Sequence, residues 1–251
     1  MLPFLRTIAR AIRVRFEGIT GLITVRDHSA WIRPIGPDSV VVDLGAHKCE
    51  FAHFFKREFG CPVFCAEPNE RVPSCLPADQ VDRIAIAGTT GSRRFSLSPN
   101  PEASSIFPEI SEEYGQSEES TVECFTLNDY LEQKGVEYVD LLKLDVEGAE
   151  IEILMGLSDD DLNRVGQMSV EFHDFLDPGL EGDVRRVISK LRQSGYTVIN
   201  CNWPHHDNML FVSRRVVKET SRFLGVMLGV AMFAYAVRGF FYSNDRIRRA
   251  S

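Results

Sequence analysis

Apolar strand-like runs alternate with amphipathic helical patterns along most of this 251-residue chain. Several of these runs are apolar nearly throughout, as expected where helices cover both faces of a parallel sheet. The last two are separated by the short segment PHH, so they must pair as an antiparallel hairpin. We therefore predict an α/β fold with a doubly wound, mostly parallel sheet that ends in this hairpin. Strands are expected at 39–45, 61–67, 83–88, 120–127, 139–146, 167–173, 195–203 and 207–214, and helices at 46–59, 126–135, 148–157 and 181–194.

The composition is that of an ordinary globular protein, with 44% hydrophobic and 25% charged residues. The six cysteines contain no CxxC pair, and the N-terminus lacks the pattern of a secretory signal peptide. We therefore expect reduced thiols and a cytoplasmic protein.

Charge is distributed unevenly. The whole chain carries −8, but residues 1–26 carry +4 and residues 213–251 carry +6, so the segment between them carries −18. An acidic body is a poor nucleic-acid binder, because contacts to phosphate need clustered Lys and Arg. Two basic ends indicate an anionic membrane surface as a partner.

Both ends also contain apolar material. Residues 1–30 read as a basic amphipathic segment, either an interfacial helix or a helix packed on the protein's own core. In the tail at 214–251, residues 223–242 form an apolar stretch interrupted only by Arg238. Its length is borderline for a membrane-spanning helix, so it predicts a short span, an in-plane anchor or a buried helix. We expect association with the cytoplasmic face of a membrane and a central domain at 31–213.

The end of the first core strand has the features of a ligand site. Asp43 and Gly45 lie where ligands bind in a doubly wound sheet, next to a helix N-terminus. Glu67 ends the next strand, 24 residues later, and an acid there can accept both ribose hydroxyls of an adenosine. This spacing also allows a nicotinamide cofactor. The loop GAHKCE lacks the G-x-G-x-x-G pattern, however, and its Glu50 would repel a pyrophosphate, so a cationic cofactor such as S-adenosylmethionine fits better.

Five segments in order resemble the FkbM-type S-adenosylmethionine-dependent methyltransferases: VVDLGAHKCEFAHFF, CAEPN, IAIAGTTGSRRF, FTLNDYL and VDLLKLDVEGAEIEILMGL. The resemblance covers about residues 31–212 and implies a Rossmann-like class I methyltransferase sheet. The sequence departs from the family pattern at His47, where Asn is usual, and at Cys49, where Gly is usual. The resemblance implies that Glu67 binds ribose and that the cofactor contacts also include Asp43, Gly45, Ala46, His47, Pro68, Asn69 and Ala87.

Three polar residues are candidates for catalysis. Asp145 ends the strand LLKLD, and Glu171 and His173 end the strand SVEFH. If these strands are adjacent, Asp145 and His173 face one another across the substrate site, where either could assist deprotonation of a hydroxyl. Both also have structural interpretations, as a helix N-cap and as a strand cap. The three residues could alternatively bind a divalent metal, which we do not favour.

The expected function is methylation of a hydroxyl on a saccharide, a lipid-linked glycan or a related metabolite, with S-adenosyl-L-methionine as the cofactor. The substrate class follows from the resemblance. Two alternatives are a catalytically degenerate methyltransferase fold that serves as a scaffold at a membrane and, less favoured, an NAD-dependent oxidoreductase.

Overall fold

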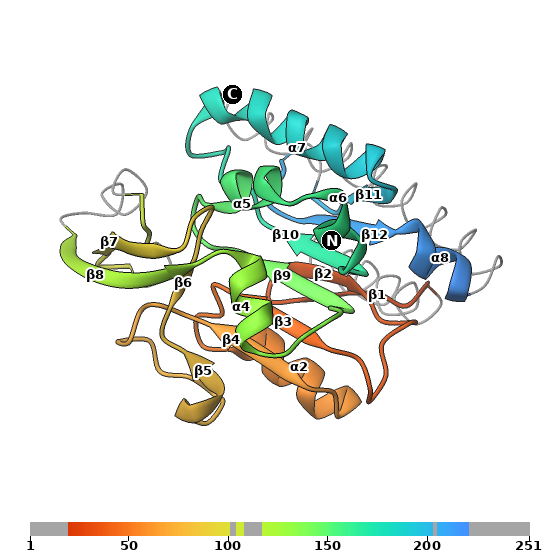
Figure 1. The fold of residues 1–251 in the computed structure, drawn as a ribbon, viewed down its shortest axis with the longest axis horizontal. Helices are drawn as coiled ribbons and strands as arrows, with labels where there is room; N and C mark the ends of the chain where they lie inside the picture. The colour runs from red at the N-terminus through yellow and green to blue at the C-terminus, as the bar shows by residue number, and fades with distance from the viewer. Residues whose placement is uncertain (1–19, 101–103, 108–116, 203–204, 221–251) are drawn as a thin grey trace, which may run out of the picture.

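The computed structural model describes residues 20–100, 104–107, 117–202 and 205–220 (Figure 1). Its main sheet has seven strands in the order β11-β12-β10-β9-β3-β4-β5. The strands from β10 to β5 run parallel, whereas β12 is antiparallel to both β10 and β11. The predicted α/β class is confirmed, with a mixed sheet. The strands are β3 (Val41–Leu44), β4 (Val63–Ala66), β5 (Val81–Asp82), β9 (Leu141–Leu144), β10 (Gln167–Val170), β11 (Tyr196–Asn200) and β12 (Met209–Ser213).

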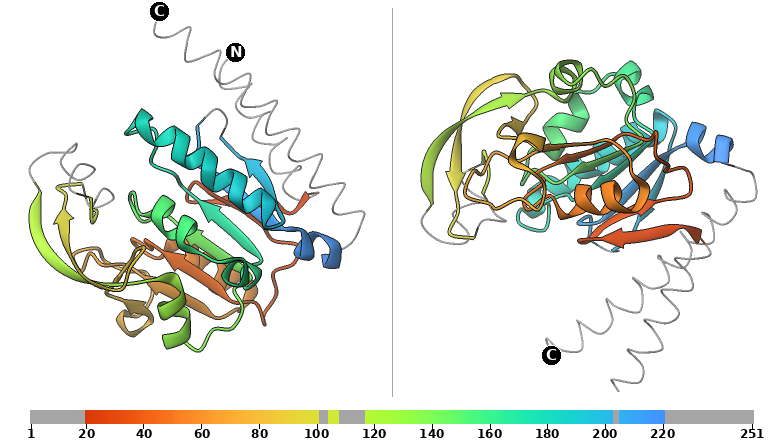
Figure 2. Two further views of the ribbon diagram at one scale, coloured as in Figure 1. Left: turned by 45° about the horizontal axis from the view of Figure 1, so that its top comes forward. Right: turned by 90° about the horizontal axis from the view of Figure 1, so that it is seen from below.

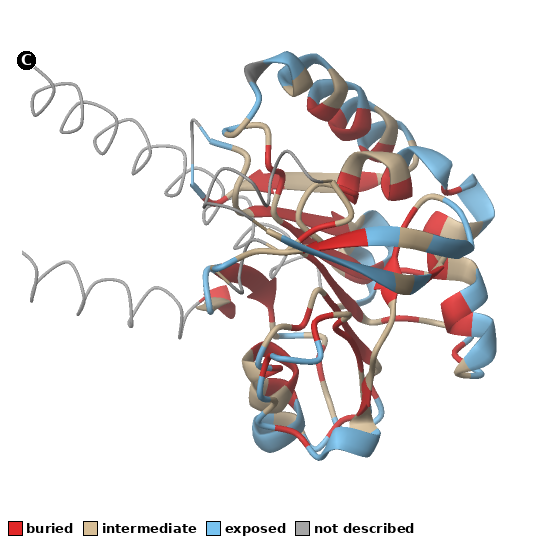
Figure 3. Ribbon diagram, turned by 90° about the vertical axis from the view of Figure 1, so that its left-hand side faces the viewer, coloured by how far each residue is buried: buried red, intermediate tan, exposed pale blue. Residues whose placement is uncertain are grey.

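Helices lie on both sides of this sheet, because the side chains of a buried strand alternate between its two faces. In β3, Val41 packs with Phe51 and Phe55 of α2. Val42, on the opposite face, belongs to the large core that also contains residues of α4, α5 and α7. Figure 2 shows the helices on both sides of the sheet, and Figure 3 shows that buried residues line the strands and the inward sides of the helices. The helices are α2 (Glu50–Phe59), α4 (Leu127–Gln133), α5 (Glu150–Gly156), α6 (Asp159–Asn163), α7 (Glu181–Gln193) and α8 (Arg214–Thr220).

Helix α2 begins at Glu50, not at residue 46 as the sequence predicted. The loop before it has left-handed backbone at Gly45 (φ 69°), His47 (φ 47°) and Cys49 (φ 60°), which a right-handed helix excludes. The helix ends at Phe59, because Gly60 takes the left-handed C-cap conformation and donates its N–H to the carbonyl of Lys56. Residues 45–49 therefore form a loop above the C-terminal end of β3.

A hairpin that the sequence did not predict, β1 (Leu22–Val25) with β2 (His28–Trp31), packs on the main sheet. Gln167 of β10 bridges to Trp31, whose N–H donates to Oε1 at 3.1 Å and whose carbonyl accepts from Nε2 at 3.0 Å. Leu22 and Trp31 are fully buried with residues of β11 and β12. The folded body therefore includes residues on the N-terminal side of the boundary predicted at residue 31.

A second sheet with three strands lies beside the main one, in the order β6-β8-β7. Its strands are β6 (Ala85–Ile86), β7 (Gly91–Leu97) and β8 (Glu118–Phe125). The strand predicted at 83–88 is reduced to β6, because the chain leaves the main sheet after β5 and pairs with β8. The paired strands β7 and β8 extend away from the main sheet (Figures 1 and 2).

The described part of the chain includes no helix that is both long enough and apolar enough to cross a membrane. The apolar stretch predicted at 223–242 and most of the N-terminal segment lie outside the described residues.

Candidate active site

A cavity of about 710 Å³ opens at the C-terminal ends of β3, β4, β9 and β10. This volume is within the usual range for small-molecule sites. The strand order reverses between β3 and β9, and open α/β sheets bind ligands at such a reversal. The hairpin β1–β2 and the connection between β11 and β12 add polar walls, through Thr24, Arg26, Asp27, His28, Asn202, Asp207 and Asn208.

At the β4 end of the cavity, Glu67 is held by two backbone groups. The N–H of His47 donates to its Oε2 at 2.7 Å, and the N–H of Asn69 donates to its Oε1 at 2.8 Å. Burial raises the pKa of this carboxyl, and the two N–H groups oppose that rise. Each carboxylate oxygen can accept a further hydrogen bond, so Glu67 can serve a ligand in the cavity.

Of the eight residues predicted to bind the cofactor, five line this cavity: Gly45, Ala46, His47, Glu67 and Pro68. The other three are not among the lining residues. Ala87 is buried, and its N–H donates to the carbonyl of Phe125. The side chain of Asn69 is buried and contacts Ser104 and the backbone of Arg71.

Asp43 is fully buried below the loop, whereas the sequence predicted that it would contact the cofactor. Its Oδ2 accepts from the N–H of Ala52 in α2 at 3.1 Å, and its Oδ1 lies 3.4 Å from Nζ of Lys143. Asp43 therefore links α2 to Lys143, which lies at the floor of the cavity, and does not itself reach into the cavity.

Lys143, which sequence reasoning missed, is the centre of the cavity floor. Its Nζ donates to the carbonyl of Gly45 at 2.7 Å and lies 3.2 Å from Oδ2 of Asp145. Burial disfavours the charge of Lys143, but Asp145 and Asp43 outweigh burial and raise the pKa of the ammonium. Burial likewise opposes ionisation of Asp145, but Lys143 and His28 hold the pKa of that carboxyl well below its usual range. The sequence feature that could have identified Lys143 is its position as a charged residue inside the apolar run LLKLD.

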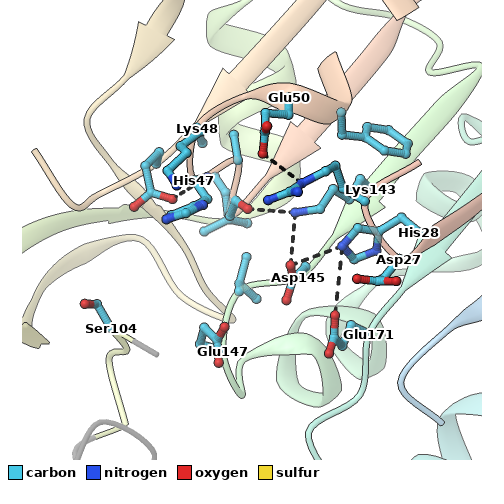
Figure 4. A pocket seen from close by; sticks show the side chains of 18 of the residues that line it. Asp27, His28, His47, Lys48, Glu50, Ser104, Lys143, Asp145, Glu147 and Glu171 are labelled. Atoms are coloured by element: carbon cyan, nitrogen blue, oxygen red, sulfur yellow. Dashed lines mark hydrogen bonds and ion pairs between the residues drawn. The ribbon is translucent and has the colours of Figure 1, made fainter. Parts of the chain in front are cut away.

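His28, also missed, comes from the hairpin and joins Asp145 to Glu171 (Figure 4). Its Nε2 lies 3.2 Å from Oδ2 of Asp145 and 3.9 Å from Oε2 of Glu171. Burial, with a contribution from the charge of Asp145, raises the pKa of Glu171 to about 8. Glu171 therefore carries a proton in part of the population near neutral pH, which suits a group that accepts and releases protons.

His173 lies 3.8 Å from Asp145, as the predicted adjacency of their strands implied, but it is not among the residues that line the cavity. Its Nε2 is 3.1 Å from Glu147 and its Nδ1 is 3.2 Å from Glu150. Burial lowers the pKa of His173, but Glu150 and Glu147 outweigh it and raise the pKa well above the ordinary value. An imidazolium cannot accept a proton. The geometry therefore favours a role in holding residues 147–150 in place over the predicted role in deprotonation.

Backbone strain is concentrated around the cavity. Among the described residues, the non-glycine residues with positive φ are Arg26, Asp27, His47, Cys49 and Glu147. All except Cys49 line the cavity, and Cys49 precedes α2 directly. Left-handed backbone at such residues costs energy and is concentrated at functional sites. Asn and Gly are the residue types that adopt this conformation most readily, and the chain has neither at positions 47 and 49.

The carboxylates of the cavity make stability depend on pH. Burial raises the pKa of Glu147 to about 7 and that of Glu171 to about 8. A raised pKa gives stability that is complete below the unfolded value near 4.5 and is lost as pH rises through 7 to 8. We expect Glu171→Gln to melt about 5 °C higher than the wild type at pH 8.5, a gain of about 2 kcal/mol. At pH 5 we expect little difference between the melting temperatures of Glu171→Gln and the wild type.

Thermal melts in buffers containing EDTA measure this effect, because the chelator removes cations that would neutralise the carboxylates. Glu58→Gln, an exposed change on α2, serves as the control and should melt like the wild type at both pH values. An equal gain for Glu171→Gln at pH 5 and at pH 8.5 would contradict the assigned titration.

The chain is similar to several known proteins. The family model described as the methyltransferase FkbM domain matches residues 43–198. A 31-O-demethyl-FK506 methyltransferase, FkbM, from Streptomyces tacrolimicus is 27% identical over 198 residues, which cover 65% of this chain and 74% of that protein. Methyltransferase sdnD from Sordaria araneosa is 25% identical over 182 residues, which cover 58% of this chain and 70% of that protein. A crystal structure of methyltransferase FkbM from Methylobacillus flagellatus KT aligns with a TM-score of 0.43 and 15% identity, over 71% of this chain and 44% of that one.

Proposed function

This chain belongs to the FkbM methyltransferase domain family, and we propose that it transfers a methyl group from S-adenosyl-L-methionine to a hydroxyl of a saccharide, a lipid-linked glycan or a related metabolite. The observation that carries the cofactor assignment is Glu67, fixed by the N–H groups of His47 and Asn69 at the rim of the cavity. The reversal of strand order between β3 and β9 supports a doubly wound class I methyltransferase sheet with a terminal hairpin.

The residues at the β3 and β4 ends fit this cofactor. Glu67 offers its remaining lone pairs to the two ribose hydroxyls, and Gly45 presents backbone without a Cβ atom. The bound cofactor supplies a methyl group on a positively charged sulfur. The ionised Asp145 provides a negative charge on the cavity floor, which favours a cation over a pyrophosphate.

The residues at the β10 end fit a hydroxyl-bearing acceptor. The side chains of Glu171 and His28 line the cavity 3.9 Å apart, where they can position an acceptor hydroxyl. Transfer between bound groups depends mainly on their alignment, which the polar wall of the hairpin and the β11–β12 connection would provide. Side chains such as Asn208 and Asp207 suit an acceptor with several hydroxyls. The name of the Streptomyces relative, a 31-O-demethyl-FK506 methyltransferase, also describes methylation of an oxygen.

Titration calorimetry with S-adenosylhomocysteine and with NAD tests the cofactor assignment. We expect the first to bind and NAD not to bind. Glu67→Ala should weaken binding of S-adenosylhomocysteine by about 100-fold or more, because each hydrogen bond to a charged group is worth about 1.5–3 kcal/mol.

Asp207→Ala is the matched control, since Asp207 lines the same cavity from the β12 side, four strands away from β4. It should bind S-adenosylhomocysteine as the wild type does. Undiminished binding by Glu67→Ala, or binding of NAD in place of S-adenosylhomocysteine, would overturn the assignment. Binding without transfer to any hydroxyl acceptor would support the scaffold alternative.

The proposed site of action is an anionic membrane surface, as the basic ends and the apolar stretch at 223–242 suggest. The test is fractionation of the full chain and of a version that ends at residue 220, before and after a high-salt wash. The truncation keeps α8, because Val216 is buried in the core. Membrane binding by the full chain alone is expected, and equal recovery of both proteins in the soluble fraction would refute the proposal.

A further inference from the structure

We propose that His28, Asp145 and Glu171 bind a divalent first-row metal cation at the acceptor end of the cavity. The three side chains converge from three separate segments: β2, the end of β9 and the end of β10 (Figure 4). One ligand atom from each lies within 4.8 Å of the other two. The metal ligands considered from the sequence were Asp145, Glu171 and His173. In the structure both ring nitrogens of His173 instead face Glu147 and Glu150.

The distances between the ligand atoms fit metal coordination. Nε2 of His28 is 3.2 Å from Oδ2 of Asp145 and 3.9 Å from Oε2 of Glu171. Ligands bound at roughly 2.1 Å lie roughly 3 Å apart when adjacent and roughly 4 Å apart when opposite. A nitrogen with two carboxylates is a donor set that suits ions such as Mn²⁺. Little movement is therefore needed for the three groups to bind one ion.

The backbone around each ligand is fixed. The N–H of Asp145 donates to the carbonyl of Leu44, and the N–H of Glu171 donates to the carbonyl of Leu144, both at 3.1 Å. The N–H next to His28, that of Ser29, donates to Oδ1 of Asn208 at 3.1 Å. The site is therefore preformed, which reduces the entropy lost when an ion binds.

His28 has an incomplete set of partners for a buried histidine. The residue is 3% exposed, and its ring packs edge-on against Phe51. Its Nδ1 has no hydrogen-bond partner, while its Nε2 faces the two carboxylates. A proton on Nδ1 leaves the Nε2 lone pair directed at the cavity, which is the tautomer that a metal needs.

Carboxyl groups outnumber positively charged groups near this site. Five carboxyl groups, of Asp43, Asp145, Glu147, Glu150 and Glu171, lie close to the two positive groups of Lys143 and His173. Lys143 also donates to the carbonyl of Gly45, so Asp145 is not its only partner. The remaining coordination positions open into the cavity, where hydroxyls of an acceptor could occupy them. This last role rests on the proposed function, whereas binding of the ion does not.

The test is titration of the full chain with MnCl₂ after removal of metals with EDTA, without cofactor. Loss of the electron paramagnetic resonance signal of free Mn²⁺ measures binding. We expect one ion per chain with micromolar affinity, and at least tenfold weaker binding for His28→Gln and for Glu171→Gln. His205→Gln, which removes an exposed histidine that does not line the cavity, should leave the affinity unchanged.

A pulsed electron paramagnetic resonance measurement of the coupling between bound Mn²⁺ and ligand nitrogens distinguishes the loss of a ligand from poor folding of a variant. The bound Mn²⁺ should show coupling to one histidine nitrogen in the wild type and in Glu171→Gln at saturating Mn²⁺, and none in His28→Gln. Absence of Mn²⁺ binding below about 1 mM, or coupling that persists in His28→Gln, would overturn the site. Because S-adenosylhomocysteine is absent from these titrations, failure of the metal site and failure of the cofactor assignment give different results.

Discussion

Gly45→Ala is expected to destabilise the protein by about 3–5 kcal/mol and to abolish binding of S-adenosylhomocysteine. Gly45 has φ 69°, and an added Cβ would lie 1.6 Å from the carbonyl oxygen of Asp145 and 2.6 Å from its carbonyl carbon. Both atoms are backbone, so no side chain can move aside. Forced overpacking costs roughly 1–3 kcal/mol or more, and an alanine in left-handed backbone adds roughly 1 kcal/mol. The loop and the end of β9 would have to separate, which displaces Asp145 from the floor.

The control Gly60→Ala separates the cost of left-handed backbone from the cost of the steric clash with Asp145. Gly60 has nearly the same φ, 71°, but an added Cβ meets no atom within 4 Å. This control should therefore lose only about 1 kcal/mol, the cost of the backbone conformation, and should bind S-adenosylhomocysteine normally. Urea unfolding and calorimetry on both variants measure the two effects. Equal destabilisation of the two variants would show that the close approach of Gly45 to Asp145 is unimportant.

The residues of the proposed cofactor end of the cavity could be located from the sequence because they follow strand ends within one contiguous pattern. Gly45 and Glu67 each come directly after a buried parallel strand, and such strands end at the same edge of a sheet. The sequence also predicted that Asp43 lies at a strand end, but it did not predict where the side chain of Asp43 points. Asp43 points below the loop, toward Ala52 of α2, so it holds the structure that carries the site.

The residues of the proposed acceptor end could not be located in the same way. His28 is 117 residues away from Asp145 and belongs to a hairpin of two four-residue strands. The turn of that hairpin has Arg26 and Asp27 in left-handed backbone, where a Gly or Asn would have marked a turn in the sequence. Lys143 was visible as a charge inside an apolar strand, but its partners come from β3 and from the loop after it. Contacts of this kind depend on strand order, which one sequence does not reveal.

Lys143→Met is expected to cost about 3–5 kcal/mol of stability, the typical loss when one partner of a buried ion pair is removed. Lys143 is 4% exposed and contacts Asp43, Asp145 and the carbonyl of Gly45. Methionine fills most of the same volume, so the loss reports the charge and not a hole in the core. Asp43 is fully buried and has no other cation within ion-pair distance among the described residues. The melting temperature should fall by about 10 °C.

Lys134→Met is the matched control, because Lys134 also forms an ion pair, 2.6 Å from Asp82, at a partly exposed position. Exposed pairs contribute at most about 1 kcal/mol, so this variant should melt within a few degrees of the wild type. Adding Asp43→Asn to Lys143→Met should recover part of the lost stability, because the second change removes one of the buried charges left without a counterion. If Lys143→Met is no less stable than Lys134→Met, the three-way contact of Lys143 does not hold the cavity floor, and the link from β3 through Lys143 to Asp145 is not the basis of the site.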